Sequence, residues 1–243
     1  MTARMWALCT SVLMDAVRRK VVWIVVFFGA VMAVAIPALP SYGVGVVEAV
    51  YREVALTLTY MATLVVTLAL AANRIPAEVE RRTVYNVLAR DVRRWEYVVG
   101  TWAGVFLTVG AIVLAFTAII IGVGWGVYGA PMWVLAEGTF AILLEAGAVA
   151  AFAVAVSTLS GPVIVSVSAL VFVFVAHARG YLLTPQDTMY SLYPSLDPFN
   201  VINPIAHGAG VSGAYVGSML VVFLAWVAVL LLIGVTAFGR RDL

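Results

Sequence analysis

The chain has 243 residues, of which 64% are apolar and 11% are charged, and its formal net charge is +2. Soluble domains carry roughly 25% charged residues, so the excess apolar side chains are predicted to face a lipid bilayer. The small net charge does not favour nucleic-acid binding, and the single cysteine, Cys9, excludes an internal disulfide and a cysteine-based metal cluster.

The first predicted element is an amphipathic helix over residues 4–19. Apolar residues recur there at helical spacing, namely Met5, Cys9, Val12, Leu13 and Ala16. This pattern predicts a helix that lies in the cytoplasmic interface with its apolar face in the acyl boundary; a frayed tail is the alternative. Basic residues 18–20 then precede an apolar run that is too long for a signal-peptide core, so the run is predicted to be a retained first span.

Six apolar runs are predicted to form transmembrane helices. They cover about residues 21–39, 48–72, 97–123, 132–159, 163–178 and 215–238. A helix needs roughly 17–25 residues to cross the hydrocarbon core, and the fifth run is at the short end of that range. A glycine-rich aromatic stretch, residues 122–131, is predicted to turn between spans 3 and 4. We therefore expect an all-α membrane protein with one transmembrane domain over residues 1–243.

The distribution of basic residues predicts the orientation of these spans. Six spans place both termini, the loop between spans 2 and 3 and the turn between spans 4 and 5 on one side. Twelve of the fourteen Lys and Arg residues fall on that side, and only Arg52 and Arg179 fall on the other. By the positive-inside rule, both termini are expected in the cytoplasm.

The segment from Asn73 to Gly100 is the longest polar stretch and holds six of the basic residues and four of the acids. Pro76 suits the first turn of a helix, where Glu78 and Glu80 would meet its positive end. One face would carry apolar residues, namely Val84, Val87, Leu88, Val92 and Trp95, and the opposite face Arg82, Asn86, Arg90 and Arg93. This pattern predicts an amphipathic helix on which a soluble protein docks. A solvated hairpin whose arginines only set the topology is the alternative.

Two further features are the segment between spans 5 and 6 and an acidic residue within span 4. Residues 180–208 contain four prolines, which forbid one long helix, yet they are too apolar for a free loop; short helices in the outer leaflet are expected. Glu145 lies deep in span 4, where a carboxylate must be protonated, paired or hydrated. It is predicted to face the protein interior, either in a translocation path or proton-sensitive switch, or as a protonated residue bonded to a neighbouring helix.

The glycines within the spans and the two histidines carry further predictions. Gly100, Gly104, Gly110, Gly138 and Gly147 are predicted to be positions of close helix approach. His177 and His207 have no ligand-spaced partners in the sequence, so no metal site is predicted.

The polar segment combines Glu78-Val-Glu80, Thr83, the pair Val87-Leu88, the small Ala89 and Arg94 ahead of the Gly100 that opens span 3. In this order, these residues resemble the loop between spans 2 and 3 of the permease subunits of ABC-2-type transporters. Arg18-Arg19-Lys20 before span 1, Asn203-Pro204, and the C-terminal Phe238-Gly-Arg-Arg-Asp-Leu243 are similar to flanking features of that family. The specific motifs occupy about a fifth of the chain.

The resemblance implies a six-span exporter subunit in the inner (plasma) membrane of a prokaryotic cell. This subunit would pair with a second copy or a paralogue and with two copies of an ABC ATPase subunit. The loop would be a cytoplasmic coupling helix, and residues 180–208 would form short re-entrant outer helices. The residues implied to dock the ATPase are Glu78, Glu80, Thr83, Val87, Leu88, Arg90 and Arg94.

The sequence contains no phosphate-binding loop of the G-x-x-x-x-G-K-[ST] type. No enzymatic activity and no directly bound cofactor are therefore expected of this chain, and ATP and Mg²⁺ would bind to the partner. A lipid-like, drug-like or peptide cargo is favoured over a small ion. The alternatives are a membrane-embedded enzyme that uses Glu145 and the histidines as acid–base groups, and a structural subunit of a larger membrane complex.

Overall fold

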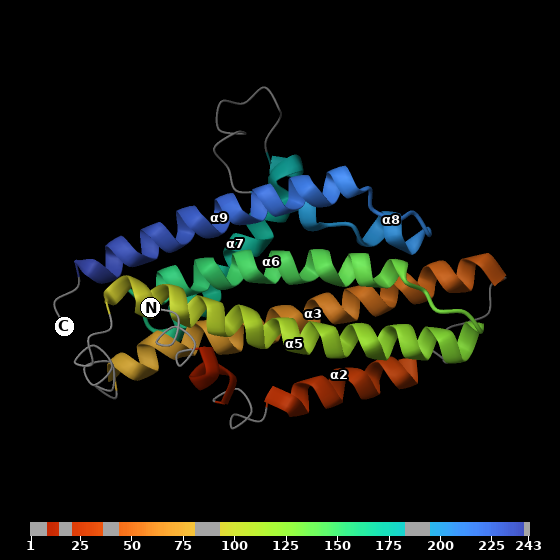
Figure 1. Ribbon diagram of the computed structural model, residues 1–243, viewed down its shortest axis with the longest axis horizontal. Helices are drawn as coiled ribbons and strands as arrows, with labels where there is room; N and C mark the ends of the chain where they lie inside the picture. Colours follow the sequence, from red (N-terminus) through yellow and green to blue (C-terminus); the bar gives the residue numbers. More distant parts are fainter. Residues whose placement is uncertain (1–8, 15–20, 36–43, 81–92, 183–194, 241–243) are drawn as a thin grey trace.

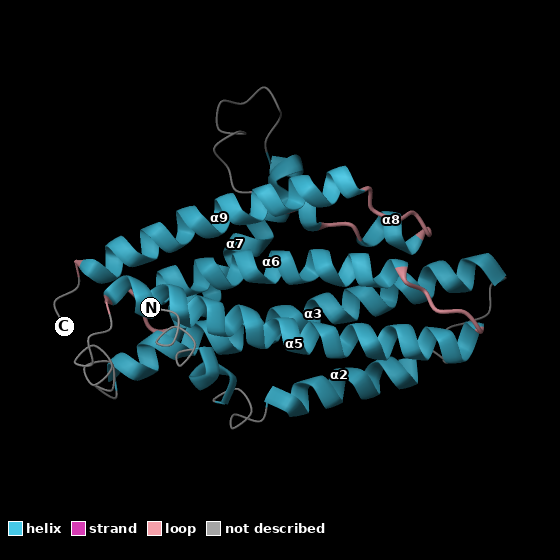
Figure 2. Ribbon diagram, in the orientation of Figure 1, coloured by secondary structure: helices cyan, strands magenta, loops and turns pink. Residues whose placement is uncertain are grey.

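The computed structural model describes residues 9–14, 21–35, 44–80, 93–182 and 195–240, and within these ranges it contains helices and their connections but no strand (Figure 2). Residues 9–14 are helical. The remaining elements are α2 (Val21–Ala35), α3 (Val44–Glu80), α5 (Arg94–Tyr128), α6 (Val134–Ser157), α7 (Pro162–Leu182), the 3₁₀ helix η1 (Asp197–Phe199), α8 (Ile202–Ala206) and α9 (Gly213–Gly239). The all-α prediction is confirmed for this part of the chain.

Four helices in the described ranges are long and apolar enough to cross a bilayer: Val47–Glu80, Arg94–Tyr128, Val134–Ser157 and Gly213–Gly239. Helix α7 contributes a shorter apolar stretch, Pro162–Ala178, and α2 is described over 15 residues. Large apolar side chains on α7 and α9 face outwards, as expected for lipid contact. The chain is therefore a helical protein with four candidate membrane spans, and the six-span arrangement remains a prediction.

Helix α6 is the centre of the bundle and packs against α3, α5, α7 and α9 (Figure 1). It is the most buried of the four candidate spans, and its middle is rich in alanine and glycine. Small side chains let neighbouring backbones approach closely, which is how helices gain packing energy where lipid removes the hydrophobic drive. The sequence of α6 thus explains its central position.

Three of the glycines predicted to allow close approach do so. A Cβ atom on Gly104 would lie 2.7 Å from Val12, one on Gly138 would lie 2.8 Å from Leu56, and one on Gly147 would lie 2.7 Å from Phe106. At Gly110 the prediction is wrong, because its nearest neighbour would lie at an ordinary 3.7 Å.

Replacing Gly147 with Ala is expected to destabilise the bundle by about 1 kcal/mol, because the new methyl group would overlap the rings of Phe106 and Phe223. The matched control is Gly122→Ala on α5, where a Cβ atom would meet nothing within 4 Å. That change should be neutral or slightly stabilising, since alanine loses less backbone entropy than glycine. Unfolding in detergent with increasing SDS measures both; equal midpoints for the two variants would contradict the packing.

The N-terminal helix packs against protein instead of offering its apolar face only to lipid. Cys9 and Val12 are buried against α5 near Gly104, and the Cys9 Sγ lies 3.8 Å from the carbonyl oxygen of Gly100. Leu13 and Met14 remain exposed, which is compatible with partial contact with the acyl boundary.

Burial raises the pKa of the Cys9 thiol. Because only the thiolate reacts, Cys9 in the folded protein is expected to react with a maleimide at least ten-fold more slowly near neutral pH than in the SDS-unfolded protein. The chain has one cysteine, so intact-mass measurement follows this residue alone. Equal rates in the folded and unfolded protein would show that the N-terminal helix is not docked on α5.

Two helix boundaries differ from the sequence prediction. Helix α3 continues to Glu80 with Pro76 inside it, so Pro76 does not begin a separate helix. Helix α5 continues to Tyr128, so most of the predicted glycine-rich turn is helical. The buried Tyr51 packs against Gly124 and donates a hydrogen bond to the Ile120 carbonyl, which fixes this end of α5 to α3. The turn itself begins at Gly129, whose φ of 76° suits glycine.

The outer segment contains two short helices in its described part. Helices η1 and α8 are separated from α7 by residues 183–194, which lie outside the described ranges. Leu196, Phe199 and Ile205 are buried against the bundle, so this stretch is an integral part of the fold rather than a free loop. At this end Arg52 pairs with Glu48 at 2.8 Å.

Candidate functional site

A cavity of about 730 Å³ lies between α3, α6, α7 and the η1–α8 stretch. Its walls are mostly apolar, and Met61, Leu170 and Phe174 line it while remaining about half exposed or more on the outer surface. The cavity is thus accessible from the lipid-facing side of the bundle. Its polar lining comes from Tyr60, Glu145, His177 and Asn200.

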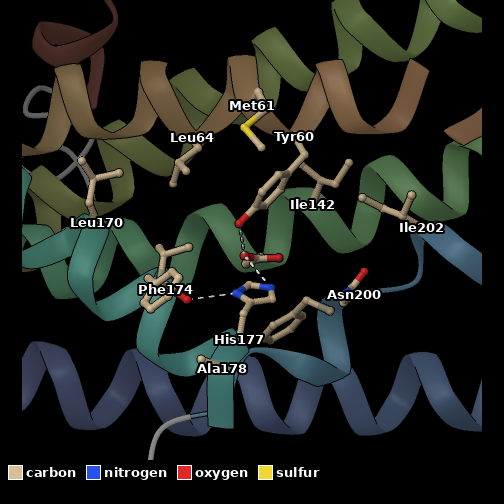
Figure 3. Close-up of a pocket in the computed structure, with 13 residues that line it drawn as sticks. Tyr60, Met61, Leu64, Ile142, Leu170, Phe174, His177, Ala178, Asn200 and Ile202 are labelled. Atoms are coloured by element: carbon tan, nitrogen blue, oxygen red, sulfur yellow. Dashed lines mark hydrogen bonds and ion pairs between the residues drawn. The ribbon is translucent and has the colours of Figure 1, made fainter. Parts of the chain in front are cut away.

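Glu145 is the centre of a polar cluster in this cavity and is only 3% exposed. The Tyr60 hydroxyl donates a 2.9 Å hydrogen bond to its Oε1, and His177 Nε2 lies 3.5 Å from the same oxygen. Figure 3 shows Tyr60 and His177 converging from α3 and α7. Glu145 faces the protein interior as predicted, and its partners come from two neighbouring helices.

The contact of His177 Nδ1 indicates which ring nitrogen carries a hydrogen. Nδ1 is 3.1 Å from the Val173 carbonyl oxygen, which can only accept, so Nδ1 carries a hydrogen. An attractive contact between Nε2 and the Glu145 carboxyl then requires a further proton on one of the two groups. The pair therefore shares one exchangeable proton, whichever residue carries it.

Thr63 is a further polar neighbour of the cluster. The Thr63 hydroxyl is buried without a hydrogen-bond partner and borders a small space that Tyr60 and Glu145 also line. Within the described ranges, no group of three or more His, Cys, Asp or Glu side chains is arranged to hold a metal ion. The side chains of Tyr60, Glu145 and His177 are able to exchange protons and to form hydrogen bonds.

A second polar arrangement lies at the basal end of the bundle, which we define as the end where α3 and α9 finish and α5 begins (left in Figure 1). Arg74 Nε pairs with Glu78 Oε1 at 2.7 Å, and the Tyr97 hydroxyl donates a 2.6 Å hydrogen bond to Glu78 Oε2. Arg74 Nη2 also donates to the Ser11 hydroxyl at 2.9 Å. This basal network joins the N-terminal helix, α3 and α5.

The basal network also compensates for a weak point in α3. Pro76 has no N–H, so the Ala72 carbonyl loses its usual helical donor. The Arg74–Glu78 ion pair spans this turn, with side chains only 16% and 19% exposed. This side-chain brace spans the turn that lacks the backbone bond, and α3 continues to Glu80.

Helix α9 is fixed to the same end. Arg94 Nη1 donates hydrogen bonds to the carbonyl oxygens of Phe238, at 3.1 Å, and Gly239, at 2.8 Å. The rings of Tyr97 and Phe238 stack with centroids 5.6 Å apart. The last turn of α9 is thereby held against the first turn of α5, and a displacement of this end would reach all three helices.

The predicted docking residues fall into three groups. Glu78 and Arg94 hold helices of this chain together, so their direct contact with a partner remains a prediction. Glu80 is exposed at the end of α3. Thr83, Val87, Leu88 and Arg90 lie outside the described residues.

Sequence reasoning missed the residues that complete both polar arrangements. Tyr60 and His177 were not linked to Glu145, because 85 residues separate Tyr60 from it and no periodic pattern connects them. Arg74 was interpreted only as a basic residue that sets the topology. Because Glu78 follows it by four positions, the sequence also predicts an ion pair between them on a helix.

Comparisons with known proteins do not identify the chain. No protein-family model matches it, and no curated protein matches it. The function is therefore argued from the geometry of the two polar arrangements.

Proposed function

We propose that this chain is the transmembrane permease subunit of an ATP-driven exporter in a prokaryotic plasma membrane. In this proposal it pairs with a second permease copy or a paralogue and with two copies of a separate ATPase subunit. The ATPase docks on residues 81–92, which connect α3 to α5, and its closure on ATP moves the basal end of both helices. No catalytic residue or cofactor is assigned to this chain itself.

The observation that carries the proposal is the construction of α3. The same continuous helix holds Glu78 beside the docking segment and Tyr60 in the cavity. These residues are 18 positions apart, or about 27 Å along a helix that rises 1.5 Å per residue. A helix braced at its base transmits displacement as a rigid element, so force applied near Glu78 reaches the contacts of Glu145.

The basal network supports the same function. A loop that only sets topology needs no fixed connection between its flanking helices. Here Arg74, Glu78 and Tyr97 link the helices on both sides of the segment, and Arg94 extends the link to α9. This arrangement suits a segment that receives mechanical work.

A membrane-embedded enzyme is the second candidate, because Tyr60, Glu145 and His177 come together on three facing helices. Such clusters can serve as acid–base groups. Against it, the described lining of the cavity includes no Ser, Cys or Lys nucleophile and no group of metal ligands. An acid–base cluster that only binds or relays a proton fits the lining better.

The proposed docking is tested by purifying the tagged chain from its native membrane with the associated soluble proteins. A P-loop ATPase is expected to co-purify with the wild-type chain in near-stoichiometric amount. Leu88→Asp and Arg90→Asp should each reduce its recovery at least ten-fold, while the exposed Arg240→Ala, outside the docking segment, should not. Recovery of no ATPase with the wild-type chain, or undiminished recovery with both Asp variants, would refute the proposal.

A further inference from the structure

We propose that the cavity around Glu145 binds a cationic amphiphile, meaning an apolar molecule with a protonated primary or secondary amine, taken directly from the bilayer. The assignment of this molecule as the exported cargo rests on the proposed transport function, whereas the binding site itself does not.

The position of the cavity selects a molecule that is dissolved in lipid. Phe174 is 72% exposed, and Met61 and Leu170 are each 49% exposed, yet all three line the cavity. Side chains that are exposed on an apolar helix surface and also border a cavity mark its lateral mouth. A ligand therefore enters between α3 and α7 without crossing the aqueous phase.

The size and lining of the cavity match one amphiphile of moderate size. Sites of about 300–1,000 Å³ bury most of a drug-sized molecule, and this cavity measures about 730 Å³. Nine of its thirteen lining residues are apolar, and the polar ones include the cluster at Glu145. An apolar body thus lies along Leu64, Ile142 and Ile202, with its polar end towards Glu145.

The charge of the site selects a cation over an anion. Among the residues whose side chains the structure describes, no Lys or Arg lines the cavity, while the Glu145 carboxyl group lies in its wall. The titratable groups that face Glu145 are Tyr60 on α3 and His177 on α7. A phosphate or carboxylate head group would find only His177 as a positive partner in this described lining and would be repelled by Glu145.

The hydrogen bonds of Glu145 leave room for an ammonium group. Tyr60 and His177 both contact Oε1, and no other described residue bonds to Oε2. An ammonium group donates up to three hydrogen bonds, to this oxygen and to the side-chain oxygen of Asn200, which also lines the cavity. Its positive charge takes the place of the proton that Glu145 and His177 share, so the site stays neutral as the amine enters and that proton leaves to water.

The proposal is tested by binding of tritiated dodecylamine to the purified wild-type chain in lipid nanodiscs, with empty nanodiscs subtracted. Tritiated dodecanol serves as the neutral probe of equal chain length, and tritiated dodecanoate as the anionic one. Dodecylamine is expected to bind saturably, at about one molecule per chain, and at least ten-fold more tightly than either of the other probes. Equal binding of dodecylamine and dodecanol would show an unspecific lipid crevice and would overturn the proposal.

Two variants and one control variant test the location of the binding site. Glu145→Gln keeps the shape of the side chain and removes its charge, so it should weaken dodecylamine binding at least ten-fold and leave dodecanol unchanged. Glu53→Gln, at an exposed acid on α3, makes the same change in net charge and should leave both probes unchanged. Met61→Trp, at the exposed mouth, should weaken both probes. Unaltered dodecylamine binding by Glu145→Gln or by Met61→Trp would contradict the assignment.

These measurements use no ATPase and no nucleotide. Absence of amine binding would therefore remove the cargo assignment while the co-purification result decides the transport proposal separately.

Discussion

Replacing Arg74 with Ala is expected to lower the free energy of unfolding by about 2 kcal/mol, because it removes partly buried, charge-assisted hydrogen bonds. The change removes the ion pair between Arg74 and Glu78, whose carboxylate also accepts the Tyr97 hydroxyl, and it removes the donor to Ser11. It also removes the brace across Pro76, so the last turn of α3 loses its support. SDS unfolding of the purified chain, followed by circular dichroism, measures the loss.

Two control variants separate this network from a general effect of charge. Arg240→Ala removes an exposed arginine near the same end of the bundle and should change the unfolding free energy by less than about 0.5 kcal/mol. Arg74→Lys keeps the charge but lacks the forked guanidinium that reaches both Glu78 and Ser11, so it should recover only part of the loss. A loss for Arg74→Ala no larger than that for Arg240→Ala would show that the network does not brace α3.

Replacing Glu145 with Ala is expected to cost about 2 kcal/mol, because it leaves the Tyr60 hydroxyl and His177 without their shared acceptor in the bundle interior. Tyr60→Phe removes one contact and should cost about 1 kcal/mol. Since both changes remove the same hydrogen bond, the double variant should be more stable than the sum of the single losses predicts. The exposed Glu53→Ala is the control and should be close to neutral.

The same SDS titration applied to the four chains of this cycle gives the coupling energy between Tyr60 and Glu145. Additive losses would mean that the two side chains do not interact, and the cluster described for the cavity would then be wrong.

The sequence predicted the helical class and most helix positions because hydrophobic runs and their glycine content are local signals. The turn between spans 4 and 5 was predicted between residues 159 and 163, and α7 begins at Pro162. The small residues of α6 likewise predicted close approach, which Gly138 and Gly147 provide.

Single-residue preferences failed where a contact to another residue accompanies a different conformation. Pro76 favours a helix start by its own chemistry, but α3 continues through it, and the ion pair between Arg74 and Glu78, four residues apart, spans that turn. Glycines near residue 124 favour a turn, but Tyr51 packs on Gly124 and keeps α5 helical. The partners of Glu145 depend on how α3, α6 and α7 cross, which no single stretch of sequence encodes.

In the proposed function, ATP-driven motion reaches the cavity through the basal network. A bimane label on Met61→Cys, in a chain whose only native cysteine is replaced by Cys9→Ser, reports on the mouth of the cavity. In the purified complex with its ATPase, addition of ATP and Mg²⁺ is expected to shift the bimane emission, and Arg74→Ala should abolish the shift while ATP is still hydrolysed. An unchanged spectrum during ATP hydrolysis, or the same shift with Arg74→Ala, would contradict the account.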